Sequence, residues 1–203
     1  MFGLKLSSLV VAASLAVSGA SAATLDFLAE GNASERGVAD GTVINFGGVN
    51  VTFSSNYYAY FDAGNAGVGV CKILDSNAQC TPASDDNLQA GETLTLAFDY
   101  AVNLSNLMFR DNGHNDITNS GKYLQIGVNG NPVTATTFAA ASATVFSDIT
   151  SITFGWGGYD PADYYISSAE AVAVVPVPAS LPLLLGGIGL LGLGARRRKK
   201  KAA

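Results

Sequence analysis

The chain has 203 residues, with 11 Lys and Arg side chains against 16 Asp and Glu, which gives a formal net charge of −5. Lys5 and the run Arg196–Lys201 hold most of the basic residues, so residues 23–174 keep four basic side chains against all 16 acids, a net charge of −12. Because nucleic-acid binding needs a basic footprint, this charge excludes nucleic acid as an expected partner. A segment of about 150 residues is long enough for one domain with its own hydrophobic core.

Residues 1–22 have the features of a secretory signal peptide. Lys5 supplies a positive start, Leu9–Val17 is an apolar stretch too short to span a membrane, and Ala20 and Ala22 are small residues suited to cleavage. The mature chain is then expected to begin near Ala23, and the implied partners are the secretion machinery and a signal peptidase. An N-terminal membrane anchor is the alternative.

Residues 23–174 are expected to form one all-β domain, because short β-type runs alternate with turn residues and no convincing helix is seen. The clearest strand is Glu92–Tyr100, in which Leu94, Leu96, Phe98 and Tyr100 share one face. Further strands are expected at Thr42–Phe46 and Asn50–Phe53 around a Gly47-Gly48 turn, at Tyr57–Asp62, Gly67–Leu74, Leu107–Arg110 and Tyr123–Val128, at Val133–Phe138 after an Asn129-Gly130 turn, around Ile152, Phe154 and Trp156, and at Tyr164–Val174. About eight to ten such strands predict an antiparallel β-sandwich, of jelly-roll type.

Cys71 and Cys80 are the only cysteines, nine positions apart in a chain that carries an export signal. We predict a local disulfide between them, which would staple a polar loop. A metal site built on cysteine and histidine is not expected, because His114 is the only histidine and no CxxC pattern occurs.

The sequence offers little catalytic chemistry. A Ser-His-Asp triad would have to use His114, which lies in the segment DNGHND and is expected to be a solvated loop residue. The adjacent Asp85 and Asp86 are the acids that a secreted hydrolase could use, although neighbouring loop residues usually point apart. We therefore predict no catalytic residues and a protein that is not an enzyme.

Three polar loops are candidates for ligand binding, at 75–87, 111–119 and 155–165. Their Asp and Asn residues could hold a structural calcium ion, for which we name no ligands, or could simply form turns. In the third loop, Trp156, Tyr159 and Asp160 form the candidate carbohydrate-binding set, since aromatic faces stack on sugar rings. Packing of Trp156 with Ile152 and Phe154 in the core is the competing interpretation.

The last 29 residues have three parts: a Pro-containing motif at Val175–Ser180, an apolar run at 181–195 and a basic cluster at Arg196–Lys201. From Pro178 to Ala195 the chain has 18 uncharged residues. As a helix these would span about 27 Å, just enough for the core of a bilayer. The basic cluster, made of Arg196, Arg197, Arg198, Lys199, Lys200 and Lys201, would hold the end of that transmembrane helix in the cytoplasm.

This layout resembles the PEP-CTERM family of exosortase-type sorting signals, in the variant whose motif reads Val-Pro-Leu-Pro-Ala. Val175, Pro176, Pro178 and Ala179 match that motif, Val177 stands where Leu is usual, and Ser180 follows. The resemblance implies a Gram-negative source, transient anchoring in the inner membrane, and cleavage near the motif by an exosortase-like enzyme, often alongside exopolysaccharide production. An ordinary C-terminal anchor is the alternative.

Taken together, these features predict a non-enzymatic protein exported to the cell surface or to the extracellular matrix of a biofilm, with a structural or adhesive role. The alternative is a secreted carbohydrate-binding module, with or without calcium. A secreted hydrolase is the least favoured class. The sequence by itself leaves the first two open.

Overall fold

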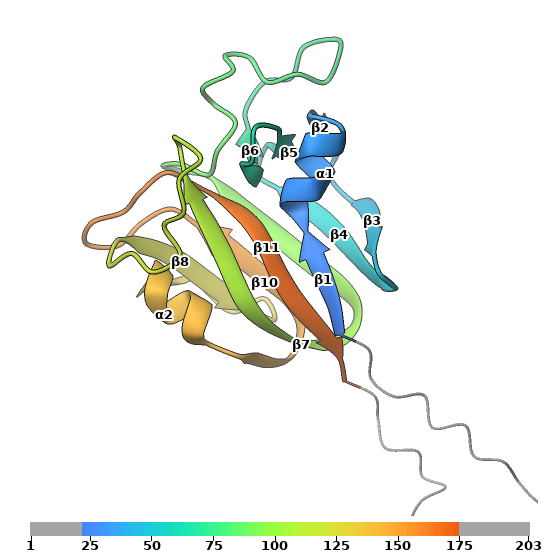
Figure 1. The fold of residues 1–203 in the computed structure, drawn as a ribbon, viewed down its shortest axis with the longest axis vertical. Helices are drawn as coiled ribbons and strands as arrows, with labels where there is room; N and C mark the ends of the chain where they lie inside the picture. Colours follow the sequence, from blue (N-terminus) through green and yellow to red (C-terminus); the bar gives the residue numbers. More distant parts are fainter. Residues whose placement is uncertain (1–21, 175–203) are drawn as a thin grey trace, which may run out of the picture.

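The computed structural model describes residues 22–174, which form eleven strands and two short helices (Figure 1). The predicted signal peptide up to Ser21, the sorting motif Val175–Ser180, the predicted transmembrane helix 181–195 and the basic cluster lie outside the described residues. The elements are β1 (Ala22–Asp26), α1 (Phe27–Ala33), β2 (Arg36–Val38), β3 (Thr42–Phe46), β4 (Val49–Ser55), β5 (Tyr58–Asp62), β6 (Gly67–Cys71), β7 (Thr93–Asp111), β8 (Tyr123–Val128), β9 (Thr134–Thr137), α2 (Phe138–Ala143), β10 (Phe146–Gly155) and β11 (Tyr164–Ala173).

All ladders between these strands are antiparallel, in the order β2-β5-β6-β11-β7-β10-β8-β9, with β1 added on β11 and the β3-β4 hairpin added on β7. This confirms an all-β, antiparallel protein, and the arrangement is consistent with a β-sandwich. The jelly-roll subtype stays a prediction.

The long strand β7 organises the sheet, because its two halves have different neighbours. Its first half pairs with β4 and β10, and its second half pairs with β10 and β11. Leu94, Leu96 and Phe98 are buried as predicted, but Tyr100 is 36% exposed, and its hydroxyl donates to the carbonyl of Gly48. The alternation is therefore interrupted at residues 99–100, where the strand passes from one set of neighbours to the next, and it resumes at Val102 and Leu104. The expectation that Tyr100 is buried with Leu94, Leu96 and Phe98 was wrong.

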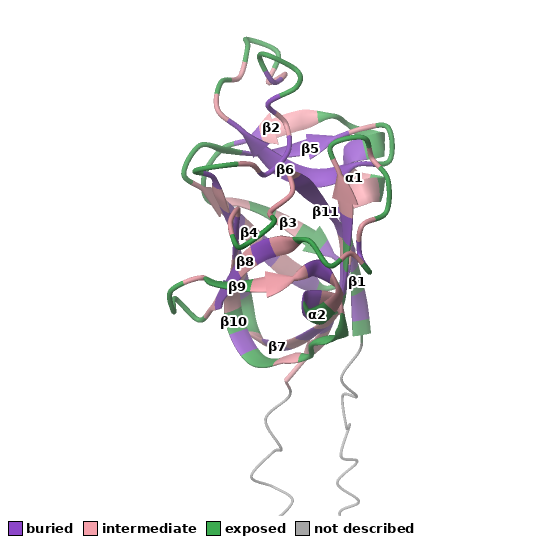
Figure 2. Cartoon of the chain, turned by 90° about the vertical axis from the view of Figure 1, so that its left-hand side faces the viewer, coloured by how far each residue is buried: buried purple, intermediate pink, exposed green. Residues whose placement is uncertain are grey.

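The core is aromatic as well as aliphatic. Phe27 and Phe61 pack edge-on against Phe53, and Phe138 and Tyr164 pack edge-on against Phe109. Edge-to-face contacts of this kind are the favoured arrangement of aromatic rings in protein interiors. Figure 2 shows that buried residues follow the facing strands, whereas the connecting loops are largely exposed.

Several predicted strands and turns are confirmed. The hairpin of β3 and β4 turns at Gly47-Gly48, where both residues have positive φ, and Asn129-Gly130 ends β8 in the same way. Leu107–Arg110 is not a separate strand but the end of β7.

The absence of any helix was the wrong expectation. Asp26 caps α1 by accepting from the amide of Ala29, and Gly31 lets α1 lie against the backbone of Asp62. Phe138 was assigned to a strand, but it opens α2, capped by Thr137, with its ring buried. Both helices have seven or fewer residues, so their periodicity is too short to read, and tertiary packing stabilises them. Within residues 22–174, no helix has the length and apolar character that crossing a membrane requires.

Candidate functional site

The two described ends of the chain lie side by side. Ala22, the first residue of β1, pairs with Val172 of β11, and the amide of Val174 donates to the carbonyl of Ala101 at 2.9 Å. Figure 1 shows both ends leaving the same pole of the body. The sorting motif predicted at Val175 therefore follows directly on Val174, the last of the described residues, which is hydrogen-bonded to the sheet.

The polar loops gather at the opposite end of β11. Tyr164, at its start, pairs with Asp111 of β7 and forms a bridge with Leu88. The sheet thus brings residues 85–88, 111–116 and 156–163, which are far apart in sequence, to one pole of the molecule. We call this the polar-loop end; in Figure 1 it lies away from the chain ends.

The predicted carbohydrate-binding residues differ in exposure and in their contacts. The indole of Trp156 is half-buried against the core and donates to Oδ1 of Asp163 at 2.9 Å, so packing, the competing interpretation, describes it better. The backbone of Asp160 accepts from the amide of Tyr123, and its carboxylate lies 3.4 Å from Nζ of Lys122. Only Tyr159 is presented freely, with 92% of its surface exposed.

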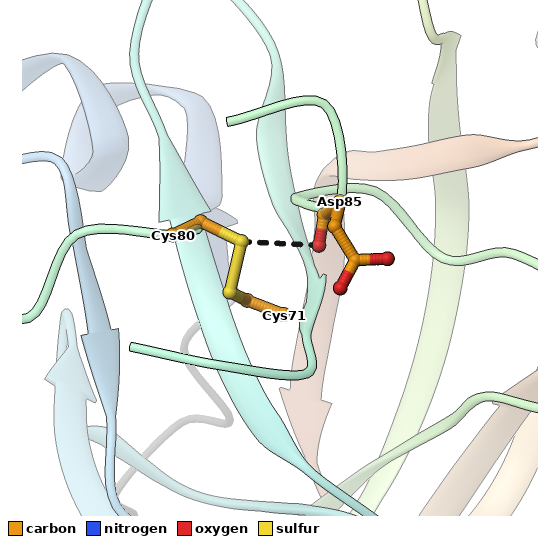
Figure 3. Close-up of side chains that lie close together, drawn as sticks. All are labelled: Cys71, Cys80 and Asp85. Carbon is orange, nitrogen blue, oxygen red and sulfur yellow. Dashed lines mark hydrogen bonds between the residues drawn. A yellow bond between two sulfur atoms is a disulfide. The ribbon is translucent and has the colours of Figure 1, made fainter. Parts of the chain in front are cut away.

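The predicted disulfide between Cys71 and Cys80 is present, with the two Cα atoms 5.8 Å apart (Figure 3). Together with Asp85, these cysteines are the one set of three metal-ligand side chains brought close together within residues 22–174. Because metals bind the thiolate and both sulfur atoms are bonded to each other, this set does not hold a metal ion.

Next to the disulfide, one cation joins two buried acids. Nζ of Lys72 lies 2.9 Å from Oδ1 of Asp85 and 2.7 Å from Oε1 of Glu92, although the latter oxygen receives no well-aligned hydrogen bond. The Glu92 side chain is fully buried. Burial raises the pKa of Glu92, and the positive charge of Lys72 and the hydrogen bond from the amide of Gln89 oppose that shift.

Two carboxylates of the polar loops, those of Asp75 and Asp111, form turns. Oδ1 of Asp75 accepts the amides of Asn77 and Gln79, and Oδ1 of Asp111 accepts those of Gly113 and Asn115. Backbone hydrogen bonds of this kind lower the pKa of Asp111 although its partial burial opposes the shift. These are side-chain-to-backbone turns, a role that Asp and Asn commonly take in loops.

His114 is not the solvated loop residue that we predicted. Its Nδ1 lies 2.9 Å from the carbonyl of Gly64, its Nε2 lies 3.1 Å from Oδ2 of Asp62, and its ring meets the ring of Tyr165 edge-on at 5.4 Å. The histidine side chain is 32% exposed and that of Asp62 only 9%. No local sequence pattern points to this contact, because the two residues are 52 positions apart and only the fold brings them together.

A second acid lies beside this pair. The hydroxyl of Tyr165 donates to Oδ1 of Asp86 at 2.5 Å. Burial, and then the charge of Asp86, raise the pKa of Asp62 to about 6, whereas the charge of His114 lowers it. Burial also raises the pKa of Asp86. We call Asp62, Asp86, His114 and Tyr165 the acid–histidine cluster.

Comparison with protein families places a PEP-CTERM protein-sorting motif at residues 174–199. This agrees with the predicted sorting signal, whereas the specific variant of the motif is not resolved by the match. No curated protein and no solved structure matches the chain.

Proposed function

We propose that the body of this PEP-CTERM-domain-containing protein is a structural or adhesive module, displayed at the cell surface or in the extracellular matrix. The motif at residues 174–199 implies that the protein is exported and carries an exosortase-type sorting signal. In this proposal the protein is not an enzyme. The signal belongs to the variant with the Val-Pro-Leu-Pro-Ala motif, on the strength of Val175, Pro176, Pro178 and Ala179.

The observation that carries the proposal is the direction of β11. This strand runs from Tyr164 at the polar-loop end to Ala173 beside the sorting motif. Ten extended residues cover about 33 Å, so an anchor at the motif leaves the polar-loop end about that far away. A precursor held in the membrane by its tail thus presents the polar loops outward.

The state of His114 supports a non-catalytic body. A histidine acting as general base needs one ring nitrogen facing the group whose proton it removes. Here both nitrogens of the only histidine face Gly64 and Asp62. A Ser-His-Asp hydrolase would therefore require a rearranged loop.

The sorting step is tested by separating anchoring from processing. Replacement of Pro176 and Pro178 by alanine is expected to leave the precursor in the inner membrane but to prevent its cleavage, so that the full-length form accumulates. Mass spectrometry of the surface-released wild type should show loss of Arg196–Lys201. A released form that still carries these residues would reduce the tail to an ordinary anchor.

A second candidate function is carbohydrate binding, and the exposure of Tyr159 favours it. Its loop is fixed by the Trp156–Asp163 hydrogen bond and by the amide of Tyr123 on Asp160, so the exposed ring is displayed on a defined backbone. An aromatic ring held in this way can stack on a sugar without a large cost in ordering.

A pull-down of the processed protein on exopolysaccharide, with and without calcium, tests this second function. Tyr159→Ala should abolish retention while leaving the fold intact, because the side chain contributes little to packing. Tyr57→Ala, at another exposed tyrosine, is the matched control. Equal retention of all three proteins would exclude Tyr159 as the binding group, and retention of none would leave the structural role as the function.

A further inference from the structure

Asp62 is a buried acid whose charge is not compensated. Its side chain is 9% exposed, and its Oδ2 has no hydrogen-bond donor in the described part of the chain. The hydroxyl of Tyr165 lies beside it but donates its single proton to Asp86. In the same part of the chain, no lysine or arginine forms an ion pair with Asp62. Buried carboxylates are ordinarily paired with a cation or bound to a metal ion.

The side chain that faces Asp62 is held in the way that a metal ligand is held. The carbonyl of Gly64 can only accept, so Nδ1 of His114, 2.9 Å away, carries a proton. In the neutral ring Nε2 then carries the lone pair, and it lies 3.1 Å from Oδ2 of Asp62. The ring is also fixed edge-on against Tyr165. A histidine that donates one ring N–H to a backbone carbonyl and leaves the other nitrogen free is the usual form of a metal-binding histidine.

The distance between the two atoms and their misalignment are both compatible with a shared metal ion. Zinc binds nitrogen and oxygen ligands at about 2.0–2.2 Å, so two such atoms on one ion lie about 3–3.5 Å apart at octahedral or tetrahedral angles. Nε2 of His114 and Oδ2 of Asp62 fall in that range. A hydrogen bond would need Oδ2 near the axis of a ring N–H, and the two atoms are not aligned in that way. When two atoms bind one metal ion, the ion occupies that axis and the second ligand lies off it.

We propose that Nε2 of His114 and Oδ2 of Asp62 bind one divalent transition-metal ion of the zinc type, and that water completes its coordination. The histidine side chain is 32% exposed, so solvent reaches the open side of the ion. Imidazole together with carboxylate favours zinc or a neighbouring metal over calcium, which takes oxygen ligands. Asp86 lies outside the ligand set, but its negative charge acts on Asp62 and adds to the attraction of a cation.

This site differs from the metal sites that the sequence suggested. The sequence has one histidine and no CxxC pattern, so a site built on several such residues was not expected. Here one histidine is enough, because the second ligand is an acid 52 positions away. Asp62 is firmly placed, since it pairs with Gly67 in the β5–β6 hairpin and its backbone lies against Gly31. An ion bound by both ligands would cross-link the loop 111–116 to the end of β5.

The single histidine gives a direct test on the full chain, purified in detergent micelles without a polyhistidine tag. With ¹⁵N-labelled histidine at pH 7.5, zinc chloride should shift the Nε2 resonance and leave the proton on Nδ1, whereas the same concentration of calcium chloride should change neither nitrogen. Zinc binding should weaken at pH 5.5. Burial and the charge of Asp86 raise the pKa of Asp62 to about 6, and a protonated carboxyl group does not bind the ion. An Nε2 resonance that does not respond to excess zinc at pH 7.5 would overturn the proposal.

Variants on the two sides of the ion separate this site from binding to surface carboxylates. Asp62→Asn and His114→Asn should each weaken zinc binding, measured by isothermal titration calorimetry, by about tenfold or more. Asparagine keeps the size of Asp62 and tolerates the φ of 61° at His114. Asp148→Asn is the matched control and should keep the wild-type affinity, because that aspartate is exposed and also sits at a positive φ.

Circular dichroism of each variant shows whether it is folded. If one of Asp62→Asn and His114→Asn does not fold, the other decides. Wild-type zinc affinity in either folded variant would refute the site.

Discussion

Replacement of Lys72 by methionine should destabilise the body more than the loss of a surface lysine. The side chain of Glu92 is fully buried and that of Asp85 is 13% exposed, and Nζ of Lys72 is the cation that both contact. Methionine keeps most of the aliphatic stem but removes the charge. Asp85 would retain the amide of residue 72 and the side chain of Gln89, whereas Glu92 would retain only the amide of Gln89.

Removing one partner of a fully buried ion pair costs about 3–5 kcal/mol, because the remaining charge is left without compensation. The Lys72 side chain is 36% exposed, so water screens its charge and we expect the lower end of this range, about 3 kcal/mol. For a domain of this size, that corresponds to a fall in melting temperature of about 6–12 °C. Lys122→Met is the control, since Lys122 and Asp160 are 48% and 62% exposed and lie 3.4 Å apart. An exposed pair of this kind contributes about 0–1 kcal/mol.

The assay is thermal unfolding of both variants, followed by circular dichroism at pH 7 and at pH 5. Burial raises the pKa of Glu92, so in Lys72→Met this acid becomes protonated on moderate acidification and its buried charge disappears. A raised pKa in the folded state means that stability is gained at low pH and lost as the pH rises. The deficit of Lys72→Met should therefore be smaller at pH 5 than at pH 7.

The double variant Lys72→Met with Glu92→Gln isolates the cause. Because it removes both charges, it should recover part of the stability that Lys72→Met alone has lost. If Lys72→Met proved no more harmful than Lys122→Met, or if Glu92→Gln gave no recovery, the argument from buried charge would be refuted.

Three other outcomes are expected. Leu96→Asp should unfold the body, because it places an unpaired charge at a fully buried position at a cost of several kcal/mol. Thr95→Asp, on the half-buried opposite face, should be milder, and equal loss of the circular dichroism signal in both variants would show that the strand faces are wrongly assigned. Replacing Cys71 and Cys80 by serine should lower the free energy of unfolding by about 2–3 kcal/mol, and thiol labelling of the native wild type should find neither cysteine reactive. Neutral residues in place of Arg196–Lys201 should weaken membrane retention, so that uncleaved protein appears in the periplasmic fraction. Unchanged retention would mean that the basic cluster is not the stop-transfer signal.

The sequence by itself determined those features that depend on neighbouring residues. The alternation of Leu94, Leu96 and Phe98 fixes which face of a strand is buried, since successive side chains point to opposite sides. The glycines at 47 and 48 mark a hairpin because they adopt positive φ without strain. Two cysteines in an exported chain have only each other as partners. The sorting signal, too, is a linear pattern of residues.

Only the tertiary structure decided which distant groups meet. Tyr100 follows the alternation of its strand, yet it is exposed because β7 changes neighbours at that point. The contact of His114 with Asp62 and the pairing of Lys72 with Glu92 depend on strand register and loop packing, to which no local pattern points. The physical reason is that periodicity reports burial along one strand, whereas the partner of a buried charge is chosen by the arrangement of all the strands together.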